Sequence, residues 1–315
     1  MVKTRLTHGV DASAIKQIAR AFHQNKIELK HDGSIVEAFR IIANSALDQV
    51  TANAPAVRAL DPEAVHQMRI GLRRLRVAIS VFSHLLKGKR TERIKRELKW
   101  LTSKLGTVRD LDVFLNSDTK LLRSQKLGAR KFVSELAAQR ATAFEKARDA
   151  VGSQRFHFLV LHTQKWIAAG DWTSRLHNNQ GIKGFAADVL TSRTKKTIKD
   201  GSKLPELDSR RCHKLRIDIK KLRYSSDFFE SLFTSHKSKQ RLAIFKNCLK
   251  ALQDRLGDLN DIFVQTKLAA EFGAKDVRTL SVSDRRRHAN PKTETLLKGA
   301  AKAEQEFACA RHFWT

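Results

Sequence analysis

Apolar residues recur every three or four positions along most of this chain, which is the spacing that places them on one side of an α-helix. The pattern is clearest in two stretches, Leu60–Phe82 and Leu207–Phe229, which align without a gap. The residues predicted to face a core are Met68, Leu72, Leu75, Ile79 and Phe82 in the first stretch, and Leu215, Ile219, Leu222 and Phe229 in the second. The repeat predicts two related halves built from amphipathic helices.

A second repeated block follows each of these stretches. Leu105-Gly106 to Asp110 matches Leu256-Gly257 to Asp261, with four residues inserted before the second copy. The predicted core positions of this next helix are Ile94, Leu98, Leu101, Leu105 and Val108, matched by Phe245, Leu249, Leu252, Leu256 and Leu259. Each half therefore has helices in the same order.

The expected fold is all-α, with two helical bundles packed together. We predict a first repeat over residues 1–165 and a second over residues 166–315, which together form one domain. Asp61 and Asp208 are the predicted N-caps of the repeated helix, and Pro62 fits its first position. Residues 170–184 are rich in turn formers and predict a connector, and residues 273–292 predict a basic loop.

The charge of the chain adds a constraint that the apolar pattern does not supply. The 315 residues carry a formal net charge of +29, whereas their apolar share of 41% is enough for a packed core and excludes wholesale disorder. A field of this strength attracts polyanions. Composition alone does not choose among nucleic acid, an anionic membrane and a phosphate polymer, although it favours nucleic acid.

The repeated helix carries its cations in a row beside the apolar stripe. His66, Arg69, Arg73 and Arg76 project within about 80° of one another on a helix. The matching row in the second half is His213, Arg216, Lys220 and Arg223, and Arg74 and Lys221 lie near the two rows. These rows contain no acid, so like charges repel along one side of each helix.

An anion that bridges the cations would offset this repulsion. Guanidinium groups bind phosphate oxygens in pairs, and cations at steps of roughly 5 Å suit an anion that itself repeats. A polyphosphate chain is such an anion. The alternative interpretation is a basic surface that only faces solvent. The repeat gives binding and a solvated surface equal weight, because the same four positions stay His or basic in both halves.

Residues on the following helix extend the candidate site. Lys99 and Lys250 align with each other and are the best candidates there for contact with a ligand. Asp110 and Asp261 could indicate metal-assisted catalysis, but we expect each to pair with an arginine of the neighbouring helix or to cap a turn. No metal site and no cofactor are expected, since neither repeated helix has the paired histidines of a helical metal site.

The two histidines that begin the rows are predicted to donate to phosphate. The reference pKa of histidine is about 6.5, and a nearby polyanion favours the protonated form. Binding should therefore strengthen as the pH falls toward 6.

Several classes of protein lack support in the sequence. There is no GxxxxGK[ST] loop, no GxGxxG after a strand and no G-x-S-x-G elbow, so an enzyme is not expected. No apolar run approaches the ~20 residues of a membrane span, and the first residues lack the apolar core of a secretory signal. The three cysteines are scattered, as in a reducing compartment, so a cytoplasmic location is expected.

The paired motifs HQMRIGLRRLR and HKLRIDIKKLR, each followed by an LGxxxD segment, resemble those of the CHAD family, the conserved-histidine α-helical domain. The resemblance covers nearly the whole chain. It implies two four-helix bundles related by a pseudo-twofold axis, with a basic surface at their junction that binds inorganic polyphosphate, and an association with polyphosphate granules. Carried onto this chain, the motif positions are His66, Arg69, Arg73, Arg74, Arg76, His213, Arg216, Lys220, Lys221 and Arg223.

The leading hypothesis is therefore a non-catalytic polyphosphate-binding protein. A nucleic-acid-binding protein is the alternative: the charge favours it, but the basic rows lack the aromatic residues on which a single strand stacks. An enzyme that acts on phosphoanhydrides is a third hypothesis, with His66 or His213 and Asp110 or Asp261 as participants. Protein partners are left open.

Overall fold

The protein is all-α in the part of the chain that the structure describes. The computed structural model describes residues 20–117, 127–170, 172, 181–204, 209–271 and 291–315, and no strand occurs among them. The predicted N-cap Asp208 and most of the predicted loop 273–292 lie outside these residues. No described helix is both long enough and apolar enough to cross a membrane.

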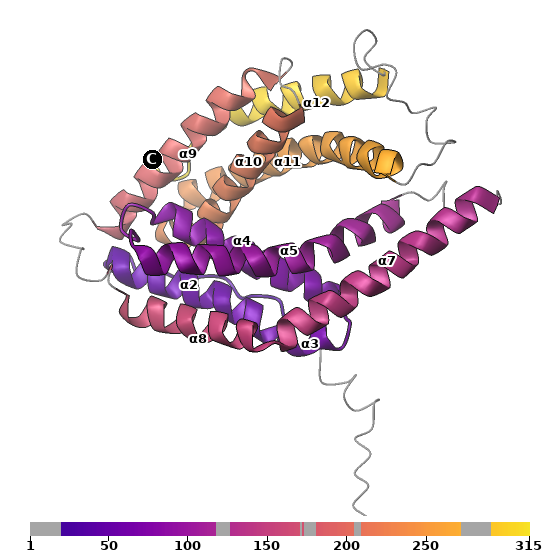
Figure 1. Ribbon diagram of the computed structural model, residues 1–315. Coiled ribbons are helices and arrows are strands. Elements are labelled where there is room, and N and C mark those ends of the chain that lie inside the picture. Colours follow the sequence, from indigo (N-terminus) through magenta and orange to yellow (C-terminus); the bar gives the residue numbers. More distant parts are fainter. Residues whose placement is uncertain (1–19, 118–126, 171, 173–180, 205–208, 272–290) are drawn as a thin grey trace, which may run out of the picture.

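The helices form two four-helix bundles related by a pseudo-twofold axis, as predicted (Figure 1). The main helices of the first bundle are α2 (Ile35–Ala52), α4 (Pro62–Val81), α5 (Lys89–Ser117) and α7 (Leu127–Gly152), which α8 (Gln154–Ala169) continues. Those of the second bundle are α9 (Ile182–Gly201), α10 (Ser209–Phe229), α11 (His236–Glu271) and α12 (Pro291–Ala308). Two short helices, α3 (Ala54–Arg58) and η3 (Glu230–Leu232), follow α2 and α10.

Local chemistry sets the ends of the helices. The Asp61 side chain accepts a hydrogen bond from the Glu63 amide at the start of α4, as predicted for an N-cap. Ser153 caps α8 in the same way through the Phe156 amide, and it separates α8 from α7. The helix α9 already begins at Ile182, inside the expected connector.

The repeated apolar positions form the two cores. All the predicted core residues of α4, α5, α10 and α11 are buried. The four extra residues of the second copy lie before Phe245, at the start of α11. Four residues are close to one helical turn, so the insertion leaves the apolar side of the helix in register.

The bundles meet where α4 contacts α10, and a cluster of phenylalanines fills the junction. Phe82 ends α4 and Phe229 ends α10, and these equivalent residues have ring centroids 6.4 Å apart. Phe185 of α9 stacks on Phe82 at 5.1 Å and meets Phe229 edge-on at 6.2 Å. Edge and offset contacts of this kind add to the free energy of burial.

Residues 20–34 precede α2 without forming a helix, and this linking segment touches both bundles. Asn53, in the first bundle, exchanges two hydrogen bonds with the backbone of Phe22. The Leu29 amide donates to the Ser231 hydroxyl of η3 at 2.9 Å, and Lys26 pairs with Glu230 at 2.9 Å. Because Leu29 is also buried, the segment joins the bundles by apolar and polar contacts.

Candidate functional site

The position of the first basic row on α4 follows from three sides of that helix. The core stripe faces the rest of the first bundle. A second side contacts α10, where the Arg74 guanidinium lies 5.7 Å from the centre of the Phe228 ring. Val77 and Val81 are near Arg74 by helical spacing, and both are buried. At 100° per residue, His66 and Arg73 fall between this second side and the side next to α5.

The second row has the same setting on α10. Tyr224 and Phe228 are the counterparts of Val77 and Val81, and both are buried. The helices that carry the two rows, α4 and α10, contact each other between the bundles, with α5 packed beside α4 and α11 beside α10 (Figure 1). The two helices with the repeated rows are thus neighbours at the junction of the bundles.

A glycine on the following helix makes room for an arginine in each half. A methyl group at Gly106 would lie 3.1 Å from Nη1 of Arg69, and one at Gly257 would lie 3.7 Å from Nη2 of Arg216. The Leu-Gly element of the repeat is therefore the place where a guanidinium from the repeated helix rests on the next helix. Nη1 of Arg69 is buried there and forms no hydrogen bond with the described residues.

The cations of the first row act on one another. Burial lowers the pKa of His66, and the charge of Arg109 lowers it further, as do Arg69 and Arg73, while Glu63 opposes them. Burial also lowers the pKa of Arg69, an effect that the Asp110 carboxylate opposes. Such a cluster is assembled against its own repulsion, so an anion placed among its members would stabilise it.

The Asp110 carboxylate is near enough to Arg69 of the neighbouring helix to oppose the lowering of its pKa. Whether Asp110 pairs with an arginine or caps a turn stays a prediction. The side chain of Asp261 lies outside the described residues, as does that of Asn260, the counterpart of Arg109. Arg109 was not among the predicted site residues. Its position one residue before the repeated aspartate is the signal that could have found it.

Two of the predicted residues form contacts within the protein. Arg74 reaches across to α10, where Asp227 counteracts the lowering of its pKa by burial. The Lys221 ammonium lies 2.9 Å from a carboxylate oxygen of Asp218, which is buried and also pairs with Lys196 of α9. Asp218 stands where the first copy has Gly71, so this part of the repeat differs between the halves.

Sequence reasoning also missed Arg193 of α9. Its guanidinium donates a hydrogen bond to the Ser80 hydroxyl of α4 at 3.2 Å, across the junction. Burial lowers its pKa, and the Asp218 carboxylate opposes that change. No repeated motif contains Arg193, because its first-copy counterpart is Ala46.

The remaining predicted residues differ in exposure. Arg76, Lys99, His213 and Lys250 are exposed, whereas Arg216, Lys220 and Arg223 are half-buried. Lys250 forms an ion pair with Asp254 one turn later at 3.5 Å, and Arg223 lies over the Tyr224 ring at 5.3 Å. Among the residues whose side chains are described, no group of three or more His, Cys, Asp or Glu could hold a metal ion.

Fold and site together define an all-helical, duplicated protein with a basic helix at the centre of each half. The chain belongs to the CHAD domain family, whose model matches residues 41–270. The crystal structure of the CHAD domain from the plant Ricinus communis is similar, with a TM-score of 0.71 and 25% identity, covering 92% of this chain and 93% of that one.

A second solved structure, PptA from Streptomyces chartreusis, shares the fold. Its TM-score is 0.51 at 17% identity, and the match covers 89% of this chain and 97% of that one. No curated protein sequence matches the chain.

Proposed function

We propose that this protein binds inorganic polyphosphate at the junction of its two bundles, without catalysis. The observation that supports the proposal is that α4 and α10, the helices that carry the two equivalent cationic rows, contact each other between the bundles. Each row repeats its charges at intervals of about one helical turn, and a phosphate chain is a linear anion that can contact several of them at once.

The electrostatics of the first row support an anionic ligand. Arg69, Arg73 and Arg109 all disfavour a charge on His66, so in the free protein the cluster is under electrostatic strain. An oxyanion would relieve this strain and accept hydrogen bonds from the same groups. We place the protein in the cytoplasm, on or near polyphosphate granules, as the family resemblance implies.

The test is a calorimetric titration of the full chain with long-chain polyphosphate, and separately with RNA and duplex DNA of matched charge. At about 0.3 M salt the Debye length is only ~6 Å, so diffuse attraction fades and fitted contacts persist. We expect tight binding of polyphosphate, lost in a variant that combines Arg73→Glu with Lys220→Glu.

The control variant makes the same change in net charge elsewhere. Lys146 of α7 and Lys302 of α12 are exposed cations on helices that do not carry the rows. Lys146→Glu combined with Lys302→Glu should leave polyphosphate binding close to that of the parent. Equal loss in both variants, or tighter binding of RNA or DNA than of polyphosphate by the parent, would replace the proposal with a general polyanion surface.

A further inference from the structure

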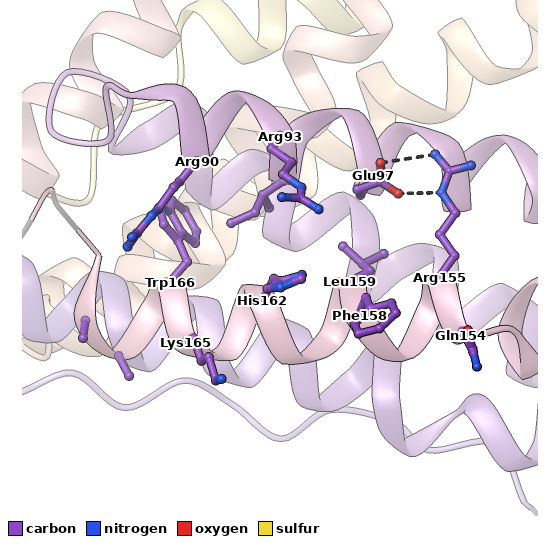
Figure 2. A pocket seen from close by; sticks show the side chains of 13 residues that line it. Arg90, Arg93, Glu97, Gln154, Arg155, Phe158, Leu159, His162, Lys165 and Trp166 are labelled. Carbon is purple, nitrogen blue, oxygen red and sulfur yellow. Dashed lines mark hydrogen bonds and ion pairs between the residues drawn. The ribbon is translucent and has the colours of Figure 1, made fainter.

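A groove on the first bundle contains none of the predicted binding residues. It lies between α5 and α8, has a volume of about 1110 Å³ and is partly open to solvent (Figure 2). The residues of α8 that line it run from Gln154 to Ala169, which corresponds to about 22 Å of helix. The groove is therefore as long as the helix that forms its lower wall.

The walls of this α5–α8 groove are basic. Arg90 and Arg93 reach into it from α5, and Lys165 comes from α8 (Figure 2). The one carboxylate among its lining residues is that of Glu97, which accepts hydrogen bonds from Arg155 at 2.7 and 3.2 Å. This pair lies toward one end, so the remainder of the groove has an excess of positive charge.

A row of flat rings lines the same groove. Phe158, His162 and Trp166 are four residues apart on α8, so they lie along one side of the helix. Trp166 is buried and packs against Phe39, so Phe158 and His162 are the exposed rings. The Phe158 and His162 rings are stacked, with centroids 5.9 Å apart and planes inclined by 20°. Phe158 is 55% exposed, which is unusual for so large an apolar side chain inside a concave surface.

The combination of rings and cations selects the chemistry of the ligand. An inorganic phosphate chain has no apolar surface to lay on Phe158, and a purely apolar segment gains nothing from the arginines and the lysine. A nucleic-acid strand has both an aromatic base and a phosphate in every unit, and proteins that bind single strands pair basic grooves with exposed rings in this way.

We infer that the α5–α8 groove binds single-stranded nucleic acid, with a base stacked on Phe158 and phosphates against Arg93 and Lys165. A length of about 22 Å accommodates several nucleotides, since stacked bases repeat every ~3.4 Å. A free nucleotide has the same chemistry on a smaller scale. This site is separate from the junction of the bundles and does not depend on the proposed function.

The experiment measures the fluorescence anisotropy of a labelled ten-nucleotide RNA of mixed sequence, titrated with the full chain. The chain carries Arg73→Glu and Lys220→Glu, so that the rows at the junction contribute little. Adding Phe158→Ala should weaken binding about fivefold or more, the effect of losing one stacked base. Leu161→Ala is the matched control, because Leu161 is exposed on the same helix but does not line the groove.

Two further arms identify the interaction. Phe158→Leu keeps an apolar side chain without a ring, so it should weaken RNA binding nearly as much as Phe158→Ala. ATP should displace the RNA at lower concentration than inorganic tripolyphosphate does, since only ATP carries a base. Displacement by ATP at concentrations near that of the RNA would assign the site to free nucleotides, whereas much weaker displacement would assign it to single strands.

Three results would overturn the inference. Phe158→Ala could bind RNA as Leu161→Ala does, or tripolyphosphate could compete as well as ATP. Either result would mean that RNA binds through charge without base stacking. Phe158→Leu could bind RNA like the parent, which would indicate apolar contact such as an acidic peptide makes. Polyphosphate binding by the single variant Phe158→Ala should equal that of the parent, so the two proposals can fail separately.

Discussion

The position of the Arg69 guanidinium depends on a glycine, Gly106, on the next helix. Gly106 leaves the space that one guanidinium nitrogen occupies, at 3.1 Å from where a methyl group would be. That distance is short enough that an alanine must push the guanidinium aside. The equivalent distance at Gly257 is 3.7 Å, an ordinary contact. The two halves therefore offer a matched pair of substitutions.

We predict that Gly106→Ala weakens polyphosphate binding by about 1 kcal/mol, roughly fivefold, because it moves one charged donor of the first row. Gly257→Ala should leave binding unchanged and raise the free energy of unfolding by roughly 0.5–1 kcal/mol, since both glycines lie inside helices. Titration calorimetry and urea unfolding of the two variants measure these effects. Equal binding by both variants would contradict the role assigned to Gly106.

His66 gives the binding a defined dependence on pH. Burial and neighbouring cations hold its pKa below the ordinary value of 6.5, whereas a bound polyanion would raise it. Binding is then coupled to uptake of a proton. Affinity is highest below the pKa of the free protein and falls as the pH rises through it toward the pKa in the complex.

We predict that His66→Gln removes the contribution of the first half to the pH dependence of polyphosphate affinity. His157→Gln is the control, because His157 is exposed on α8 and forms a hydrogen bond with the nearby Ser153 carbonyl. The stability of the free protein has the opposite dependence on pH. Because the pKa of His66 is lower in the folded protein than in the unfolded chain, the unfolded chain takes up the proton first, and the free energy of unfolding decreases as the pH falls through 6.5. Dissociation constants and unfolding midpoints between pH 5 and 8 test both signs.

At the scale of elements, the repeated helix packs against its neighbour differently in the two halves, where α4 meets α2 and α10 meets α9. In the first half α2 approaches α4 closely at Gly71, where a methyl group would lie 3.0 Å from the Ala46 carbonyl oxygen and from a Val50 methyl. In the second half the same position is Asp218, which pairs with Lys196 of α9. One contact depends on shape and the other on charge.

We predict that Gly71→Ala lowers the free energy of unfolding by about 1–3 kcal/mol, because backbone atoms of α2 stand in the way of the new methyl group. Chemical denaturation measures the loss, with Gly257→Ala as the comparison in which the new methyl group meets no atom closer than 3.7 Å. A gain in stability at Gly71 would mean that α2 and α4 can separate freely.

The helices and their buried sides were predictable because the signal for them is local. Met68, Leu72 and the other stripe residues needed only helical periodicity and the repeat. Which sides of α4 and α10 face each other was not predictable from periodicity, since the contact between Arg74 and the Phe228 ring joins residues 154 positions apart in the chain. The groove with Phe158 was missed for a related reason, because its second wall comes from residues about 65 positions earlier.

At the scale of the whole molecule, salt acts in opposite directions on folding and on binding. A net charge of +29 destabilises the compact state by self-repulsion, which salt screens. Contacts with many phosphates release counterions, so salt weakens binding. Both effects are screening by salt. In folding, salt screens the repulsion between cations of the protein, whereas in binding it screens the attraction between those cations and the phosphates.

We predict that added sodium chloride raises the melting temperature of the free protein and lowers that of the complex with polyphosphate. Polyphosphate at a hundred times its dissociation constant should stabilise the parent by about 2.7 kcal/mol at low salt. The variant with Arg73→Glu and Lys220→Glu should gain much less. Scanning calorimetry over a series of salt concentrations measures both trends, and parallel trends for free and bound protein would contradict them.

The linking segment has a consequence for the order in which the chain is assembled. Leu29 donates to Ser231, a partner 202 residues later in the chain, while Phe22 is already bonded to Asn53. During synthesis the first bundle can form before Ser231, the acceptor for the Leu29 amide, has been made. Only when η3 emerges from the ribosome can the segment dock fully, so completion of the molecule depends on a contact of very high sequence separation, the kind that slows folding most.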